Sequence, residues 1–76
     1  MPIAFVLIGV ETGSEHEVVE QLKVMSTVKG CYSVYGVYDI VVKIEAASER
    51  ELKETITYKL RGLPKIRSTQ TLMVSD

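Results

Sequence analysis

The chain has 76 residues, which is enough for one domain and no more. Hydrophobic residues make up 46% and charged residues 25%, as in ordinary globular proteins, and the net charge of −1 argues against a primary nucleic-acid binder. Cys31 is the single cysteine, so an intrachain disulfide is excluded, and Cys31 and His16 alone are too few ligands for structural zinc. A chain this short buries only about 60% of its unfolded surface, so we expect self-association to supplement its stability.

The first half of the chain predicts a strand followed by a helix. Residues 3–10 form an apolar and β-branched run typical of a strand. After a break at residues 12–13, Ser14 and Glu17 have the spacing of a capping box, which predicts a helix over residues 14–26. Apolar residues recur at helical spacing behind the box, at Val18, Val19, Leu22 and Met25, and Gly30 is expected to end this unit before the next strand.

The second half repeats this order. Residues 31–35 and 37–45 are expected to be strands, with Gly36 at the turn or bulge between them. Ser48 and Glu51 form a second capping box, ahead of the apolar stripe Leu52, Ile56 and Leu60. The proline at residue 64 ends this helix, and residues 66–74 read as the last strand.

The resulting order is β-α-β-β-α-β, and an offset of 34 residues superimposes the two halves. The offset places Ser14 on Ser48, Glu17 on Glu51 and Leu22 on Ile56. Two β-α-β units with right-handed crossovers interleave into a four-stranded antiparallel sheet with both helices on one face. We therefore predict a single α+β domain of ferredoxin-like architecture over residues 1–76.

The first strand is apolar on both of its sides. Ile3, Phe5 and Leu7 alternate with Ala4, Val6, Ile8 and Val10, so both faces of the sheet carry apolar side chains here. Strands of this kind are normally buried on both faces, and a second copy of the same sheet is the simplest cover. The alternative is a small monomer with an apolar open sheet.

The longest apolar run is too short to span a bilayer and lacks the features of a signal peptide, so we expect a cytoplasmic protein without membrane contact.

Three groups of polar residues have ordinary structural explanations. His16 could be a general base or metal ligand, but no second His or Cys lies at ligand spacing, which favours an exposed residue on the helix surface. Cys31 reads as a small apolar residue at the start of a strand. The basic residues around the end of the second helix and the start of the last strand could bind phosphate or could complement the helix C-terminus; they are Lys59, Arg61, Lys65 and Arg67.

Two other segments are better candidates for ligand binding. Asp39 lies beside Tyr35, Gly36 and Tyr38, where glycine allows backbone groups to approach a ligand and the carboxylate could receive an ammonium group; the alternative is an ordinary hairpin turn. Residues 68–71 place hydroxyl and amide side chains in the last strand, which could bind a carboxylate or simply face water. Neither segment provides a nucleophile with an adjacent base, so we predict no enzyme activity.

At these two segments the sequence resembles the effector domain of the Lrp/AsnC (leucine-responsive, or feast/famine) transcriptional regulators, also called the RAM domain. One hallmark is a Gly-x-Tyr-Asp turn before an apolar strand, matched by residues 36–44. The other is a Leu-Pro turn followed by a Thr-x-Thr strand, matched by residues 63–72, except that Lys65 stands where the family usually has glycine. The resemblance covers nearly the whole chain.

The resemblance implies dimers formed sheet against sheet, assembly into octamers or similar rings, and amino-acid effectors bound at subunit contacts. Asp39 would face the α-ammonium group of the effector. The other residues implied in the site are Tyr35, Gly36, Tyr38, Ser68, Thr69 and Thr71. Because the sequence starts at the first strand, we expect a stand-alone effector domain that lacks the helix-turn-helix module and does not bind DNA.

Besides a purely structural assembly domain with an empty site, two functions follow as hypotheses. The first is an amino-acid-sensing domain without cofactor or metal that modulates regulators by assembly, with full-length Lrp/AsnC proteins as possible partners. The alternative is a small dimeric ferredoxin-like enzyme, such as a cofactor-free monooxygenase or an isomerase. Those enzymes need catalytic His, Asn or Trp in a pocket between helices and sheet, and this chain has one His and neither Asn nor Trp.

Overall fold

The structure, a computed structural model, describes residues 1–75. The elements follow the order β1 (Ile3–Val10), α1 (Glu15–Lys23), β2 (Val28–Ser33), β3 (Ile40–Glu45), α2 (Glu49–Glu54), η1 (Thr55–Leu60) and β4 (Ile66–Met73). A helix therefore follows the first strand of each half of the chain, α1 after β1 and α2 after β3. The predicted ferredoxin-like βαββαβ fold is confirmed.

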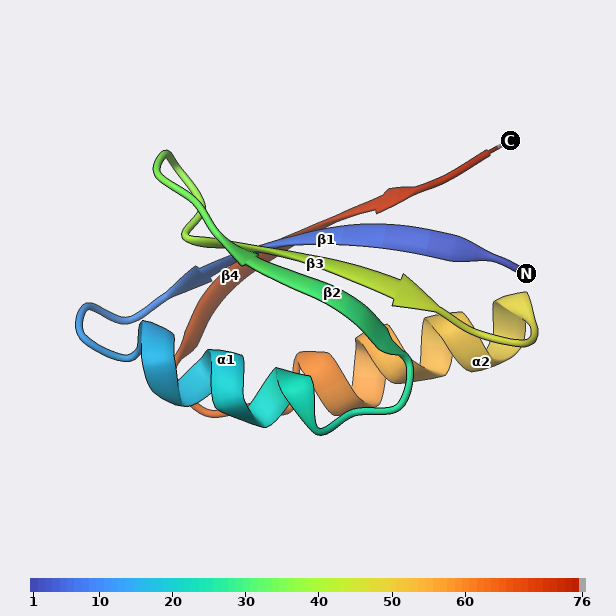
Figure 1. Cartoon of the computed structure of the whole chain (residues 1–76), viewed down its shortest axis with the longest axis horizontal. Helices are drawn as coiled ribbons and strands as arrows, with labels where there is room; N and C mark the ends of the chain where they lie inside the picture. Colours follow the sequence, from blue (N-terminus) through green and yellow to red (C-terminus); the bar gives the residue numbers. More distant parts are fainter. Residues whose placement is uncertain (76) are drawn as a thin grey trace.

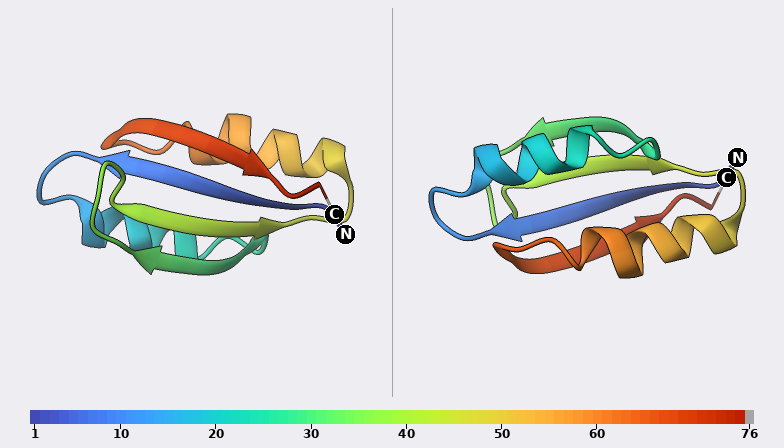
Figure 2. Two further views of the ribbon diagram at one scale, coloured as in Figure 1. Left: turned by 90° about the horizontal axis from the view of Figure 1, so that it is seen from above. Right: turned by 90° about the horizontal axis from the view of Figure 1, so that it is seen from below.

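The four strands form one antiparallel sheet in the order β2-β3-β1-β4. The first strand of each half is central, and Val6 pairs with Val42 between them. Both helices lie on one face of the sheet, α1 below β2 and β3, and α2 with η1 below β1 and β4 (Figures 1 and 2). No helix of residues 1–75 covers the opposite face, as the topology predicts.

The core lies between the sheet and the two helices. Alternate residues of the central strands are fully buried there, including Val6, Ile8, Val42 and Ile44. Leu22 from α1 and Leu52 from α2 close the core from below, both with no exposed surface. Burying one such side chain contributes about 1.5–3 kcal/mol, so this layer supplies most of the stability of the domain.

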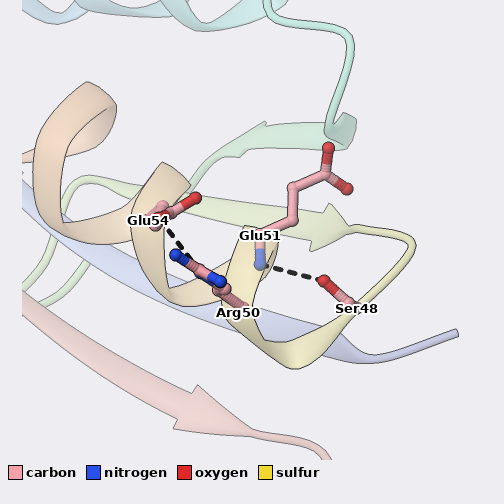
Figure 3. Close-up of polar contacts among 4 residues, drawn as sticks. All are labelled: Ser48, Arg50, Glu51 and Glu54. Carbon is pink, nitrogen blue, oxygen red and sulfur yellow. Dashed lines mark hydrogen bonds and ion pairs between the residues drawn. The ribbon is translucent and has the colours of Figure 1, made fainter.

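The two predicted capping boxes have different outcomes. Ser48 caps α2 as predicted, because its hydroxyl accepts a hydrogen bond from the Glu51 backbone N–H at 3.1 Å (Figure 3). The Glu51 carboxylate in turn accepts from the Ala47 N–H at 2.8 Å. Ser14 lies at the start of α1, but its side chain makes no capping hydrogen bond. The prediction of a helix start was right at both places, and the prediction of a capping box was right at one.

Element boundaries differ from the predictions where glycine misled them. The first helix ends at Lys23 rather than residue 26, and β2 begins at Val28 rather than Cys31. Gly30 does not separate helix from strand; it lies within β2, at a register shift against β3. The third strand begins at Ile40 rather than residue 37, because the residues before it form a loop.

The second helix continues beyond Glu54 as a π-helical segment. In η1 the Arg61 N–H donates to the Ile56 carbonyl, five residues back. The predicted apolar stripe nevertheless holds, because Leu52, Ile56 and Leu60 are all buried. Within residues 1–75, no helix has the length and apolar character needed to cross a membrane.

Candidate functional site

The loop between β2 and β3, residues 34–39, rises from the sheet on the side away from the helices (Figure 1). Its base is closed by a hydrogen bond from the Val34 N–H to the Asp39 carbonyl at 2.8 Å. The Asp39 N–H also donates to the Ile8 carbonyl of β1 at 2.9 Å. The base of the loop is therefore fixed on the central strands, which gives Asp39 a defined position.

Asp39 connects the loop to two other strands. Its Oδ2 atom accepts a hydrogen bond from the Val10 N–H at 2.9 Å, and the guanidinium of Arg67 lies 4.0 Å from the same oxygen. The side chain of Asp39 is 30% exposed, so the carboxylate is held by the backbone but still reachable. A positioned carboxylate beside a guanidinium can recognise an ammonium group and a carboxylate at neighbouring points.

Sequence reasoning placed Arg67 at the start of the last strand, within a basic cluster, and missed its contact with Asp39. The available signal was the antiparallel pairing of β1 with β4, which brings the start of β4 beside the end of β1. Val10 pairs with Ile66 there, after a shift in register that follows Gly9.

Tyr38 reaches across the open face of the sheet. Its hydroxyl donates to the Gln70 Oε1 atom on β4 at 3.1 Å. Gln70 pairs with Leu7, so the hydrogen bond passes over the central strand β1. Gln70 is a second residue that sequence reasoning left out of the site, although it lies in the segment that was singled out for its polar side chains.

The tip of the loop makes no comparable contacts. Tyr35 is fully exposed and Val37 is 84% exposed, which is unusual for side chains of their size. Gly36 between them has φ of +152° and open space around the position of a side chain. The tip is therefore an apolar projection shaped by a glycine conformation that other residues rarely adopt.

The three hydroxyl residues of β4 lie on two different faces. Ser68 pairs with Gly9 on the open face, and its hydroxyl is 2.8 Å from the position that a Cβ atom at Gly9 would occupy. Thr69 and Thr71 pair with Ile8 and Val6, whose side chains face the helices. The Thr71 Oγ1 atom is buried there without a hydrogen-bond partner. The structure thus brings Ser68 to the side of Tyr38 and Gln70, and places the two threonines behind the sheet.

A hollow of about 310 Å³ lies beside the loop. It is lined by Asp39, Ser33, Val34 and Tyr35, and by Glu15 from the first turn of α1. Its walls come from a helix, a strand and a loop, whereas two other hollows are grooves along a single helical stretch, residues 49–59. Ligand pockets are typically about 300 Å³ or larger and built from several elements, so the hollow beside Asp39 is the better candidate.

The remaining candidates agree with their structural explanations. His16 is exposed on α1, and Cys31 packs at the edge of the core. Burial raises the pKa of the Cys31 thiol, and the nearby Lys23 ammonium lowers it by a smaller amount, so the thiol is protonated and unreactive at neutral pH. Among residues 1–75, no group of three or more His, Cys, Asp or Glu side chains is placed to hold a metal ion.

The open face of the sheet combines apolar side chains from all four strands. Phe5 and Leu7 from β1 and Val41 from β3 are half-buried, Tyr32 from β2 is 57% exposed, and Leu72 from β4 is 47% exposed. The loop of residues 34–39 rises on this same side (Figure 1). This face is therefore more apolar than the surface of a typical small monomer.

Comparison with known proteins gives consistent matches over almost the full chain. A sequence model of the Lrp/AsnC ligand binding domain matches residues 3–76. The HTH-type transcriptional regulator FL11 of Pyrococcus abyssi is 32% identical over 72 residues, which are 95% of this chain and 47% of the regulator. The chain therefore spans about half the length of this curated relative.

Solved structures show the same fold. The crystal structure of FFRP-DM1 superimposes with a TM-score of 0.94 and 42% sequence identity, covering 97% of this chain and 99% of FFRP-DM1. The transcriptional regulator NMB0573 of Neisseria meningitidis, crystallised as a complex with L-Met, has a TM-score of 0.88 at 12% identity, over 99% of this chain and 50% of the regulator. At that identity the likeness concerns the fold alone. The chain belongs to the Lrp/AsnC ligand binding domain family, a family of transcriptional regulators.

Proposed function

We propose that this domain binds a small amino acid beside Asp39 and passes the binding event to transcriptional regulators through assembly. In this proposal, the α-ammonium group of the ligand lies against the Asp39 carboxylate. Tyr35, Gly36 and Tyr38 of the loop frame the site, and Ser68 lines it from the open face. Thr69 and Thr71 point to the helix-facing side of β4 and are therefore not included in this site.

The observation that carries the proposal is the position of Asp39 between a backbone donor and Arg67. The hydrogen bond from the Val10 N–H orients the carboxylate, and the guanidinium is 4.0 Å away. Both side chains are partly exposed, and ion pairs of this kind contribute at most about 1 kcal/mol to stability. A zwitterion can therefore insert its ammonium group at Asp39 and its carboxylate at Arg67 at small cost, replacing one weak ion pair by two.

Self-association is the second part of the proposal. The apolar open face would be covered by a second copy of the sheet, because a two-fold contact buries the same side chains on both chains. The exposed loop tip, with Tyr35 and Val37, would then lie near a subunit contact and close the hollow beside Asp39. Larger rings and mixed assemblies with full-length Lrp/AsnC regulators would connect ligand binding to transcription.

Two measurements test the proposal together. Isothermal titration with each of the twenty amino acids should give saturable heat with at least one of them. Light scattering at micromolar protein concentration should give a mass above that of one chain, and the mass distribution should change when that amino acid is added.

The matched variant is Asp39→Asn, which keeps an oxygen for the Val10 N–H and removes the charge. It should weaken binding by roughly tenfold or more, because a charge-assisted hydrogen bond to the ligand is lost. Its free energy of unfolding should change by less than about 1 kcal/mol. Unchanged affinity in the folded variant, or no heat with any amino acid, would overturn the assignment of Asp39 as the ammonium site.

A further inference from the structure

We infer that the amino acid bound beside Asp39 has a basic side chain, and that Glu15 recognises its terminal cationic group. This inference rests on the proposed function, because it concerns the same site. Its physical basis is the hollow of about 310 Å³ in which Glu15 and Asp39 are both lining residues. Nothing in the motifs that identify the family involves Glu15.

The charge of the hollow selects for cations. Its two charged lining residues are both carboxylates, one from the first turn of α1 and one from the end of the loop before β3. No Lys or Arg is among the five residues that line it. Neither ion pair found among residues 1–75 involves Glu15, so its carboxylate is not neutralised within the chain. Asp39 lies 4.0 Å from the Arg67 guanidinium, so Glu15 carries the uncompensated charge that would repel an anionic side chain.

The shape and the other walls fit a flexible basic side chain. At about 30 Å³ per water molecule, the hollow has room for roughly ten waters, which is the scale of one amino acid. Val34 and the Tyr35 ring provide apolar contact for a methylene chain, and an aromatic face also attracts a cation. The Ser33 hydroxyl offers one further hydrogen bond. An ammonium group at each end of the ligand would then meet one of the two carboxylates.

A divalent metal ion fits the same hollow less well. Such ions prefer six or more oxygen ligands, with several from carboxylates. As stated above, the described chain has no group of three acidic, His or Cys side chains placed for a metal ion. Two separate carboxylates in a hollow with apolar walls match two separated ammonium groups better than one compact ion.

Glu15 also has a structural explanation that must be separated from ligand recognition. An acidic residue in the first turn of a helix is stabilised by the positive end of the helix dipole. Glu17 has the same relation to α1 and is exposed, but it does not line the hollow. Glu17→Gln is therefore the matched control for Glu15→Gln, since both remove one charge from the same helical turn.

The experiment is isothermal titration of the full chain with lysine, norleucine and glutamate. Norleucine has the four side-chain carbons of lysine and lacks only the terminal ammonium group. We expect lysine to bind roughly tenfold or more tightly than norleucine, and glutamate to bind weakest. Glu15→Gln should remove most of the preference for lysine and leave norleucine unchanged, while Glu17→Gln should leave both affinities within about twofold.

Each outcome has a defined meaning. Norleucine binding as tightly as lysine, or a lysine preference that survives Glu15→Gln, would overturn the inference while the proposed amino-acid site stands. Lysine bound more weakly by Glu15→Gln and Glu17→Gln alike would assign the effect to the general charge of α1 and also overturn it. No binding of any amino acid would remove the proposed function itself. Circular dichroism of each variant checks that it is folded.

Discussion

The two β-α-β halves of this domain are similar in sequence pattern but serve different purposes. In both halves the first strand is central in the sheet, and the helix after it covers one face. The connections that follow differ. The first half continues into β2 and then into the exposed loop of residues 34–39, whereas the second half passes from η1 through a short turn into β4. The repeated parts build the core, and the parts that diverge build the candidate site.

The difference indicates which kind of constraint acts on each region. Core positions at an offset of 34 residues need only apolar volume, so Leu22 and Ile56 are interchangeable in kind. The loop of residues 34–39 is fixed by specific polar contacts of Asp39 and Tyr38, for which the second half has no equivalent. We expect substitutions at repeated positions to act on stability and those in the loop to act on binding.

The largest effect should come from the equivalent core positions. Leu22→Ala and Ile56→Ala should each lower the free energy of unfolding by about 2–5 kcal/mol, because each removes buried methyl groups and leaves a cavity. Leu22 is fully buried and Ile56 is 6% exposed, so the loss should be somewhat larger for Leu22. Urea unfolding monitored by circular dichroism gives both values at a fixed protein concentration.

Val24→Ala is the control for this pair, because Val24 is 83% exposed at the end of α1. Its free energy of unfolding should stay within about 0.5 kcal/mol of the original. A loss below about 1 kcal/mol for Ile56→Ala would show that the π-helical segment contributes little to the core. The two halves would then differ in packing as well as in their connections.

A smaller effect should distinguish the two helix starts. Ser48→Ala removes the hydroxyl that accepts from the Glu51 N–H, and should cost about 1 kcal/mol. Ser14→Ala removes no capping hydrogen bond and should cost less than about 0.5 kcal/mol. The measurement is again the free energy of unfolding in urea. Equal losses for the two variants would mean that both serines cap their helices in solution and that the halves are more alike than their geometry shows.

The fold could be predicted from the sequence because its determinants are local or periodic. Proline and glycine punctuation, alternating apolar residues and a repeated helix pattern gave the element order and the architecture. Gly30 was misread as a break because a glycine at a bulge and a glycine at a helix end look alike in sequence. The missing hydroxyl cap at Ser14 was equally invisible, since the pattern contains the residue types and not their torsion angles.

The candidate site could be predicted only in part. The loop motif drew attention to Tyr38 and Asp39, whose contacts with Gln70 and Arg67 depend on strand register, which sequence does not give. The separation of Ser68 from Thr69 and Thr71 onto two faces follows from strand alternation. Glu15 was not singled out, because its approach to the loop depends on where α1 begins relative to β2.

The smallest effect concerns the turn before β4, where the second half departs from the pattern of its family. Lys65 has φ of +74°, a left-handed conformation, and the resemblance identified this position as one usually held by glycine. The conformation costs a residue with a Cβ atom about 1–2 kcal/mol, and glycine loses about 0.5–1 kcal/mol more backbone entropy on folding. Lys65→Gly should therefore raise the free energy of unfolding by about 0.5–1 kcal/mol.

Lys65→Ala is the control, because it keeps the Cβ atom, and it should change the free energy of unfolding by less than about 0.5 kcal/mol. An equal gain in both variants would assign the effect to the lysine charge instead of the backbone. If only the glycine variant is stabilised and its lysine affinity is unchanged, the strain at this turn is independent of the site, as the separation of core and loop functions requires.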